Sequence, residues 1–212
     1  LDFINVTIIT ESCTDPSACN YNPNTICLDT AIDNCIFPNA CGDCEDPGFV
    51  QSIELPVGWS LFSTYICPFN PSFDVVMTDL VNDDNLIIAK NQNGAVYWPG
   101  FGLNTIGDLE NGRGYLVKMQ NESILNISGD VLSYDYPISM TNGWSYIGYL
   151  HQETHFIEDM FDSILSNILI VKDSQGNVFW PMFGLNSIET MSPGMAYQIN
   201  LFNEMVFSYP EA

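Results

Sequence analysis

The chain has 212 residues, of which 46% are hydrophobic, and its 26 acidic residues against 4 basic ones give a formal net charge of -22. A charge of this sign repels phosphate backbones and anionic lipid headgroups, and no Lys/Arg cluster forms a local exception. We therefore expect no binding to nucleic acid or to a membrane surface. No apolar run approaches the roughly 20 residues that a helix needs to cross a bilayer, so we expect no membrane insertion.

The first segment, residues 1–12, is predicted to be an N-terminal strand. Its β-branched residues alternate between two faces, with Ile4, Val6 and Ile8 on one and Phe3, Asn5, Thr7 and Ile9 on the other. No hairpin partner follows it, so it must pair with a distant part of the chain or with a neighbouring subunit. We expect its residues Phe3, Ile4, Val6 and Ile8 to form an assembly strand. Since the chain begins with Leu1 and not Met, we expect a mature form or a fragment.

Residues 13–48 are predicted to form a small disulfide-rich module. This segment holds six of the seven cysteines: Cys13, Cys19, Cys27, Cys35, Cys41 and Cys44. Because it is poor in large apolar residues, it depends on cross-links, which form in an oxidising, extracellular compartment. A zinc site is less favoured, since only Cys41 and Cys44 have a C-x2-C spacing and no nearby His completes a ligand set. The seventh cysteine, Cys67, is a buried inert thiol, a partner of this module or a link to another chain.

The rest of the chain is a tandem duplication, with one repeat domain over residues 49–130 and a second over 131–212. GWSLFSTYI at Gly58–Ile66 matches GWSYIGYLH at Gly143–His151. Lys90 aligns with Lys172, and the alignment continues without a gap from Lys90 to Asn126. Self-similarity over such a length is the signature of a repeated structural unit.

Each repeat is predicted to run strand, helix, hairpin, irregular loop and hairpin. The helices are expected over Ser72–Val81 and His155–Ser166. The first hairpins are expected to have two-residue turns at Asn93-Gly94 and Gln175-Gly176, and the second to turn near Asn121-Glu122 and Asn203-Glu204. The aromatic and β-branched flanks favour antiparallel sheets. The predicted fold class is mainly β (α+β), with two homologous β-rich domains and about one helix in each.

Candidate catalytic residues are few, and we expect no enzyme. His151 and His155 have the His-x3-His spacing that holds zinc from one helix face, but Glu153 is displaced from the position a zinc protease requires. No other His exists to act as a base for a nucleophile. No pair of acids suited to glycoside hydrolysis is retained in both repeats.

The matched loops Trp98–Gly102 and Trp180–Gly184 have the sequence W-P-x-F-G. Their aromatic side chains could stack on sugar rings, which makes Trp98 and Trp180 candidates for glycan binding. The favoured interpretation is instead that Trp and Phe fill the end of each domain, because aromatic side chains are mostly buried. Lys90 and Lys172, at matching positions, are each expected to pair with a carboxylate or to cover apolar surface.

Two sets of motifs resemble secreted multidomain surface proteins of the Bacteroidota. CTDPSACNYNPN (Cys13–Asn24) is similar to their CTDPxACNYxP module, and the repeats resemble one with a GW[NS] start, a K[DN]xxGxV[YF]WP hairpin, an FG[IL]N[ST]I loop and a GY strand. The resemblance implies surface display or secretion, with no established activity. It also implies a calcium-binding closing segment, for which Asp15, Asp29 and Asp33 are the candidate ligands, although DTAIDNC here lacks the glycine and one acid.

Short motifs mark candidate glycosylation sites. Asn5, Asn121 and Asn126 lie in N-x-[ST] sequences. Thr30 and Ser163 lie in D-[ST]-hydrophobic sequences, which resemble the O-glycosylation motif of the Bacteroidota.

Together these features favour a structural or adhesive subunit of an extracellular assembly or filament, which self-associates by adding its N-terminal strand to a sheet of the next subunit. Two alternatives stay open. One is a glycan-binding accessory module of a secreted protein, and the other is a calcium-stabilised spacer. Apart from this calcium, no cofactor is expected.

Overall fold

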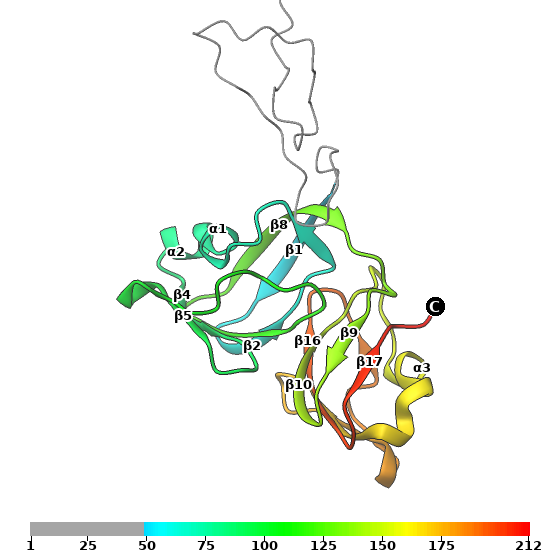
Figure 1. Cartoon of the computed structure of the whole chain (residues 1–212). Helices are drawn as coiled ribbons and strands as arrows, with labels where there is room; N and C mark the ends of the chain where they lie inside the picture. The colour runs from blue at the N-terminus through cyan, green and yellow to red at the C-terminus, as the bar shows by residue number, and fades with distance from the viewer. Residues whose placement is uncertain (1–48) are drawn as a thin grey trace, which may run out of the picture. The chain divides into compact units, whose positions relative to one another are not determined.

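The computed structural model describes residues 49–212, and Pro47–Ala212 form one compact unit. The predicted N-terminal strand and disulfide-rich module lie outside the described residues. Antiparallel strands dominate, and the described residues include three short α-helices (Figure 1). The predicted mainly β fold class is confirmed.

The first repeat consists of a five-stranded and a three-stranded antiparallel sheet. The five-stranded sheet has the order β2 (Gly58–Phe62), β7 (Tyr115–Met119), β4 (Leu86–Lys90), β5 (Val96–Trp98) and β6 (Leu103–Asn104). The three-stranded sheet has the order β1 (Phe49–Leu55), β8 (Ser123–Val131) and β3 (Ile66–Pro68).

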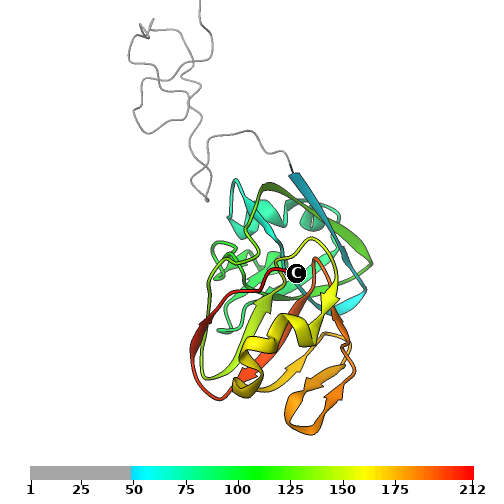
Figure 2. The same cartoon turned by 90° about the vertical axis from the view of Figure 1, so that its right-hand side faces the viewer.

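The second repeat contains the same five-stranded sheet. Its order is β10 (Gly143–Gly148), β16 (Ala196–Leu201), β12 (Ile168–Lys172), β13 (Val178–Trp180) and β14 (Leu185–Asn186). Two shorter pairs accompany it, β9 (Ile138–Met140) with β17 (Met205–Phe207) and β11 (His155–Phe156) with β15 (Thr190–Met191). The helix α3 (Ile157–Phe161) lies beside these strands (Figure 2).

The predicted helices are shorter than expected. In the first repeat the helical segment is divided into α1 (Phe73–Val76) and α2 (Thr78–Asn82), because Met77 has a φ of -94° and a ψ of 5°. In the second repeat His155 belongs to β11, and α3 (Ile157–Phe161) continues as the 3-10 turn η2 (Asp162–Asn167). β-branched and short polar residues in both segments weaken the α-helix.

The hairpin predictions were partly wrong. The first turns do use glycine at positive φ, 82° at Gly94 and 92° at Gly176, but the backbone N–H of Asn91 pairs with the Ala95 carbonyl, so three residues and not two form the first turn. An Asn or Asp side chain accounts for the longer turn, since the Asn91 Oδ1 accepts the N–H of Ala95 at 3.0 Å. The expected second hairpins do not form, because β7 and β8 join different sheets, as do β16 and β17.

Each repeat has its own hydrophobic core. The first core contains Phe62, Phe73 and Tyr115, and the second contains Phe161 and Tyr209. Strand alternation explains which residues enter the cores, since β1 shows alternate burial from Gln51 to its end.

The two repeats contact each other through matching residues. Phe62 bridges to Met195, and Arg113 bridges to Ile147. In the duplication Phe62 corresponds to Ile147 and Arg113 to Met195, so the two bridges exchange equivalent positions. The backbone bonds show the same exchange, because Ser63 donates to Gly194 at 2.9 Å and Gly148, the equivalent of Ser63, donates to Gly112 at 2.9 Å. The repeats therefore pack in the manner of an isologous dimer.

Candidate functional site

The W-P-x-F-G sequences form a short 3-10 turn in each repeat, η1 (Pro99–Phe101) and η3 (Pro181–Phe183). Proline fixes φ at the start of the turn, and the glycine that ends it lies in the left-handed region, with a φ of 61° at both Gly102 and Gly184. The glycine N–H closes the turn by donating to the proline carbonyl at 3.0 Å in both copies. The sequence thus specifies the same rigid loop twice.

These loops expose their phenylalanines. Phe101 is 74% exposed and Phe183 is 68% exposed, so the expectation that they fill the end of each domain is wrong. Each ring meets its Trp edge to face, with centroids 4.4 Å apart for Trp98 and Phe101 and 4.7 Å for the second pair. The residue that precedes each tryptophan in its strand points into the core instead, because neighbouring residues of a strand point to opposite faces of the sheet.

A polar pair lies on the other face of each sheet from the tryptophan of the loop, because Asn104 pairs with Tyr97 and Asn186 pairs with Phe179. The Asn104 Nδ2 donates to the Asp74 carboxylate at 2.7 Å, and in the second repeat the Asn186 Nδ2 donates to Glu158 at 3.3 Å. The carboxylate comes from the first turn of a helix and the amide from the strand that follows the W-P-x-F-G turn. Each of these bonds therefore ties the short helix to the strand that follows the turn.

A second tryptophan occupies the opposite edge of each five-stranded sheet. Trp59 is 43% exposed and Trp144 is 45% exposed. The Lys90 Nζ lies 5.4 Å and the Lys118 Nζ 5.7 Å from the Trp59 ring centroid, and the Lys172 Nζ lies 5.0 Å from that of Trp144. These distances are typical of cation–π contacts.

Strand register puts both tryptophans of a repeat on the same face of its sheet. Trp59 pairs with Lys118, Lys90 with Val96, and Trp98 with Leu103. Directly paired residues share a face, and so do alternate residues along a strand. The aromatic face, as we name it, is defined in the first repeat by Trp59, Lys90, Lys118, Trp98 and Phe101. In the second repeat it is defined by Trp144, Lys172, Trp180 and Phe183.

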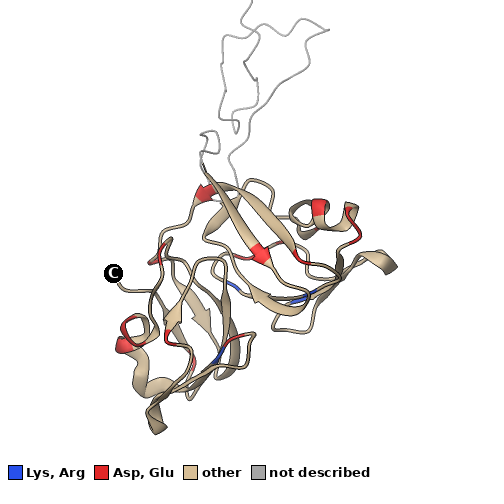
Figure 3. Cartoon of the chain, turned by 180° about the vertical axis from the view of Figure 1, so that it is seen from behind, with Lys and Arg blue, Asp and Glu red and all other residues tan. Residues whose placement is uncertain are grey.

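The aromatic faces hold all three lysines of the chain. The expectation that the lysines cover apolar surface fits these contacts with tryptophan. The expectation that they pair with a carboxylate does not, because the ion pair found among residues 49–212 joins Arg113 to Glu110 and involves no lysine. Acidic residues are spread over the rest of the unit, while the basic segments are few (Figure 3). Matching lysines and tryptophans in both repeats were a sequence signal for this face, but only Trp98 and Trp180 were predicted to be candidates.

The predicted histidines lie together in the second repeat, where His151 is buried and His155 is half-buried. His151 is 8% exposed, donates from Nε2 to the Pro210 carbonyl at 3.0 Å and stacks on Tyr134. The Nδ1 of His155 lies 2.7 Å from the Tyr149 hydroxyl. Burial, and then the nearby His155, lower the pKa of His151. The two rings do not lie on one helix face, because α3 begins only at Ile157.

Within residues 49–212 no group of three or more His, Cys, Asp or Glu side chains could hold a metal ion, and no helix is long and apolar enough to span a membrane. The calcium candidates Asp15, Asp29 and Asp33 lie outside this range. So do the six clustered cysteines, the assembly strand, and the glycosylation candidates Asn5 and Thr30.

The remaining predicted residues are placed as follows. Cys67 is fully buried and disulfide-bonded, so it is not an inert thiol. Ser163 is exposed in η2, and Asn121 is exposed in the turn after β7. Asn126 lies on the exposed side of β8 and accepts a hydrogen bond from Ser52 at 2.7 Å.

Comparisons with protein-family models, curated proteins and solved structures found no match to this chain. The resemblance to secreted surface proteins stays a prediction. The aromatic faces are the structural features that indicate a function.

Proposed function

We propose that the chain is a non-catalytic, adhesive subunit of an extracellular surface assembly, and that each aromatic face binds a saccharide. The observation that carries this proposal is the exposure of Phe101 and Phe183 beside a tryptophan at matching positions of both repeats. Adjacent exposed aromatic groups on a rigid loop are typical of a binding site. The apolar face of a sugar ring is their complement.

The charge of the faces narrows the ligand class. In a chain of net charge -22, every lysine lies on an aromatic face. An ammonium group over an indole ring attracts a carboxylate that approaches beside it. We therefore expect saccharides that contain uronic acids to bind better than neutral ones, with an affinity that falls as salt is added.

A glycan array followed by titration calorimetry tests the proposal. The wild type should bind with two sites per chain, and Phe101→Ala should weaken one site and leave the other unchanged. A lost aromatic contact is worth about 0.5–1.5 kcal/mol, so the altered face should bind roughly 3- to 10-fold more weakly. Phe49→Ala is the matched control, since Phe49 is also exposed, at 54%, but lies on β1 away from both faces. An array without any bound saccharide would refute this function.

Self-association through the N-terminal strand and extracellular location belong to the same proposal. The alternating sequence of residues 1–10 supports self-association, and the clustered cysteines support the extracellular location. Both features lie in residues 1–48, outside the described range. Deletion of residues 1–10 should reduce assembly without changing the saccharide affinity. Unaltered assembly in electron micrographs would contradict the strand-addition mechanism.

A further inference from the structure

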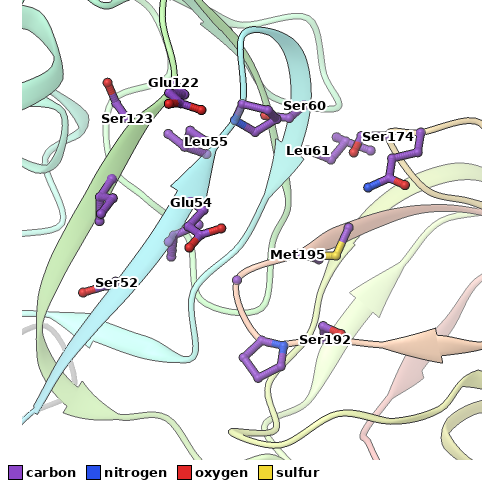
Figure 4. A pocket seen from close by; sticks show the side chains of 16 residues that line it. Ser52, Glu54, Leu55, Ser60, Leu61, Glu122, Ser123, Ser174, Ser192 and Met195 are labelled. Atoms are coloured by element: carbon purple, nitrogen blue, oxygen red, sulfur yellow. The ribbon is translucent and has the colours of Figure 1, made fainter.

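A cleft of about 890 Å³ lies between the two repeats. One wall is the end of β1 and the start of β2, including Glu54, Leu55 and Ser60, and the facing wall is the loop Ser192–Met195 together with Gln175. Figure 4 shows Glu54 and Met195 on opposite sides of this cleft. Its lining combines apolar side chains, such as Leu55 and Met195, with polar ones, such as Glu54 and Gln175.

β1 forms an edge of its sheet beside this cleft. It pairs with β8 on one side, and among residues 49–212 no backbone hydrogen bond joins its other edge to a further segment. Such an edge is a template for another strand. The equivalent edge in the second repeat is covered, because Arg113 donates from its guanidinium to the Ser139 carbonyl at 2.6 Å.

The duplication shows why the two edges differ. Ser139 corresponds to Glu54, and the position of Arg113 is taken by Met195, which has no donor for the Glu54 carbonyl. Because the second repeat has Met195 where the first has Arg113, the edge of β1 stays unbonded and the cleft is more apolar.

A buried hydroxyl in this cleft also has no partner. Ser60 is 4% exposed and its Oγ makes no hydrogen bond, whereas the equivalent Ser145 accepts the Thr141 N–H at 3.2 Å. Proline occupies the position equivalent to Thr141, at Pro56, and has no N–H to donate. An unpartnered buried hydroxyl costs about 1–3 kcal/mol, which a bound polar group would recover.

We propose that this cleft is the acceptor for the strand of residues 1–10 from a second copy of the chain, which adds to the free edge of β1. This inference rests on the self-association part of the proposed function. A strand occupies about 160 Å³ per residue at ordinary strand and sheet spacings, so the cleft holds about five residues, as many as the alternating run Ile4–Ile8 contains. The apolar face of that run suits the methionine and leucine of the walls.

Among residues 49–212 the edge of β1 is unbonded, so the added strand comes from outside this range, and the proposal assigns it to a second copy. Donor and acceptor are different surfaces, so the contact is heterologous and does not close on itself in a pair. Repetition of such a contact produces an open chain of subunits. The N-terminal strand and the inter-repeat cleft are thus the two halves of a polymer contact.

Sedimentation velocity of the full chain tests the donor and the acceptor separately. Wild type should form dimers and longer species at micromolar concentration. Val6→Asp on the predicted buried face and Gln175→Trp at an exposed turn of the cleft should each leave monomers. The controls Thr7→Asp, on the other face of the strand, and Asn93→Trp, at the equivalent turn of the first repeat, should assemble like wild type.

A mixture of the Val6→Asp and Gln175→Trp chains gives the sharpest result. The first keeps an intact cleft and the second an intact strand, so equimolar mixing should restore a 1:1 dimer and no longer species. A wild type that stays monomeric would overturn the proposal, and so would a Gln175→Trp chain that assembles normally. Glycan titration of the same variants separates the two proposals, since both variants should bind saccharide with wild-type affinity even if assembly is lost.

Discussion

Replacement of Gly114 by alanine tests the packing of the two repeats. A Cβ at this position would lie 2.5 Å from the Ala196 Cβ and 3.3 Å from the Tyr146 Cβ. Two methyl carbons need about 3.5–4.0 Å, so the repeats must separate by roughly 1 Å. The obstructing carbon is fixed to the backbone of β16 and cannot rotate away. Overpacking of this kind costs about 1–3 kcal/mol, which lowers the Tm by roughly 4–8 °C at the middle of that range for a unit of this size.

Gly114 and Ala196 occupy equivalent positions in the duplication, so the steric conflict can be exchanged. Ala196→Gly alone should cost about 0.5–1 kcal/mol, because glycine in a strand is less favourable. The double variant should recover most of the stability lost by Gly114→Ala, in a double-mutant cycle measured by urea unfolding. Gly100→Ala is the control, since no atom lies within 4 Å of the added methyl. Equal stability of Gly114→Ala and Gly100→Ala would refute the described contact between the repeats.

Three further predictions concern single sites. Ser60→Ala should raise the free energy of unfolding by about 1–3 kcal/mol because it removes a buried hydroxyl without a partner, whereas Ser145→Ala should lower it by about 1 kcal/mol, both measured in urea. The pKa of His151 is lowered in the folded state, so unfolding takes up a proton and stability should fall as the pH drops below about 6.5. His151→Gln should flatten that part of a stability–pH curve. Gly129→Ala should destabilise by about 3 kcal/mol in thermal melts, because its Cβ would lie 2.1 Å from the Cys67 carbonyl oxygen.

The sequence predicted those features that local chemistry determines. The duplication, the positive φ of Gly94 and Gly176 and the mainly β fold class follow from patterns that lie within a few residues of each other. The pairing of β8 with β1 and β3, instead of with β7, was not predictable in this way. Hairpin reasoning assumes that adjacent strands pair, and here a three-residue connection passes from one sheet to another.

The candidate site was only partly predictable for a related reason. Aromatic residues are usually buried, and that general rule predicted Phe101 to be in the core. Tyr97 of β5 points to the inner face of the sheet, so its neighbour Trp98 points outward. The η1 turn that follows then places Phe101 away from the core. Pairing of Lys90 with the ring of Trp59 depends on two strands separated by β7, and no local pattern contains that information.

The differences between the two repeats are informative because both copies contain the same five-stranded sheet. At the contact between the repeats, a symmetric pair of surfaces would have two equivalent edges, either both open or both covered. Arg113 covers the edge in the second repeat, whereas the equivalent Met195 leaves the edge of β1 open. On this open side Pro56 replaces the equivalent Thr141, so Ser60 has no partner. A chain with one acceptor, and not two, forms a linear polymer instead of a branched one. In the proposed assembly this asymmetry limits each subunit to one acceptor, while the aromatic faces, which are retained in both copies, are the two proposed saccharide sites of each subunit.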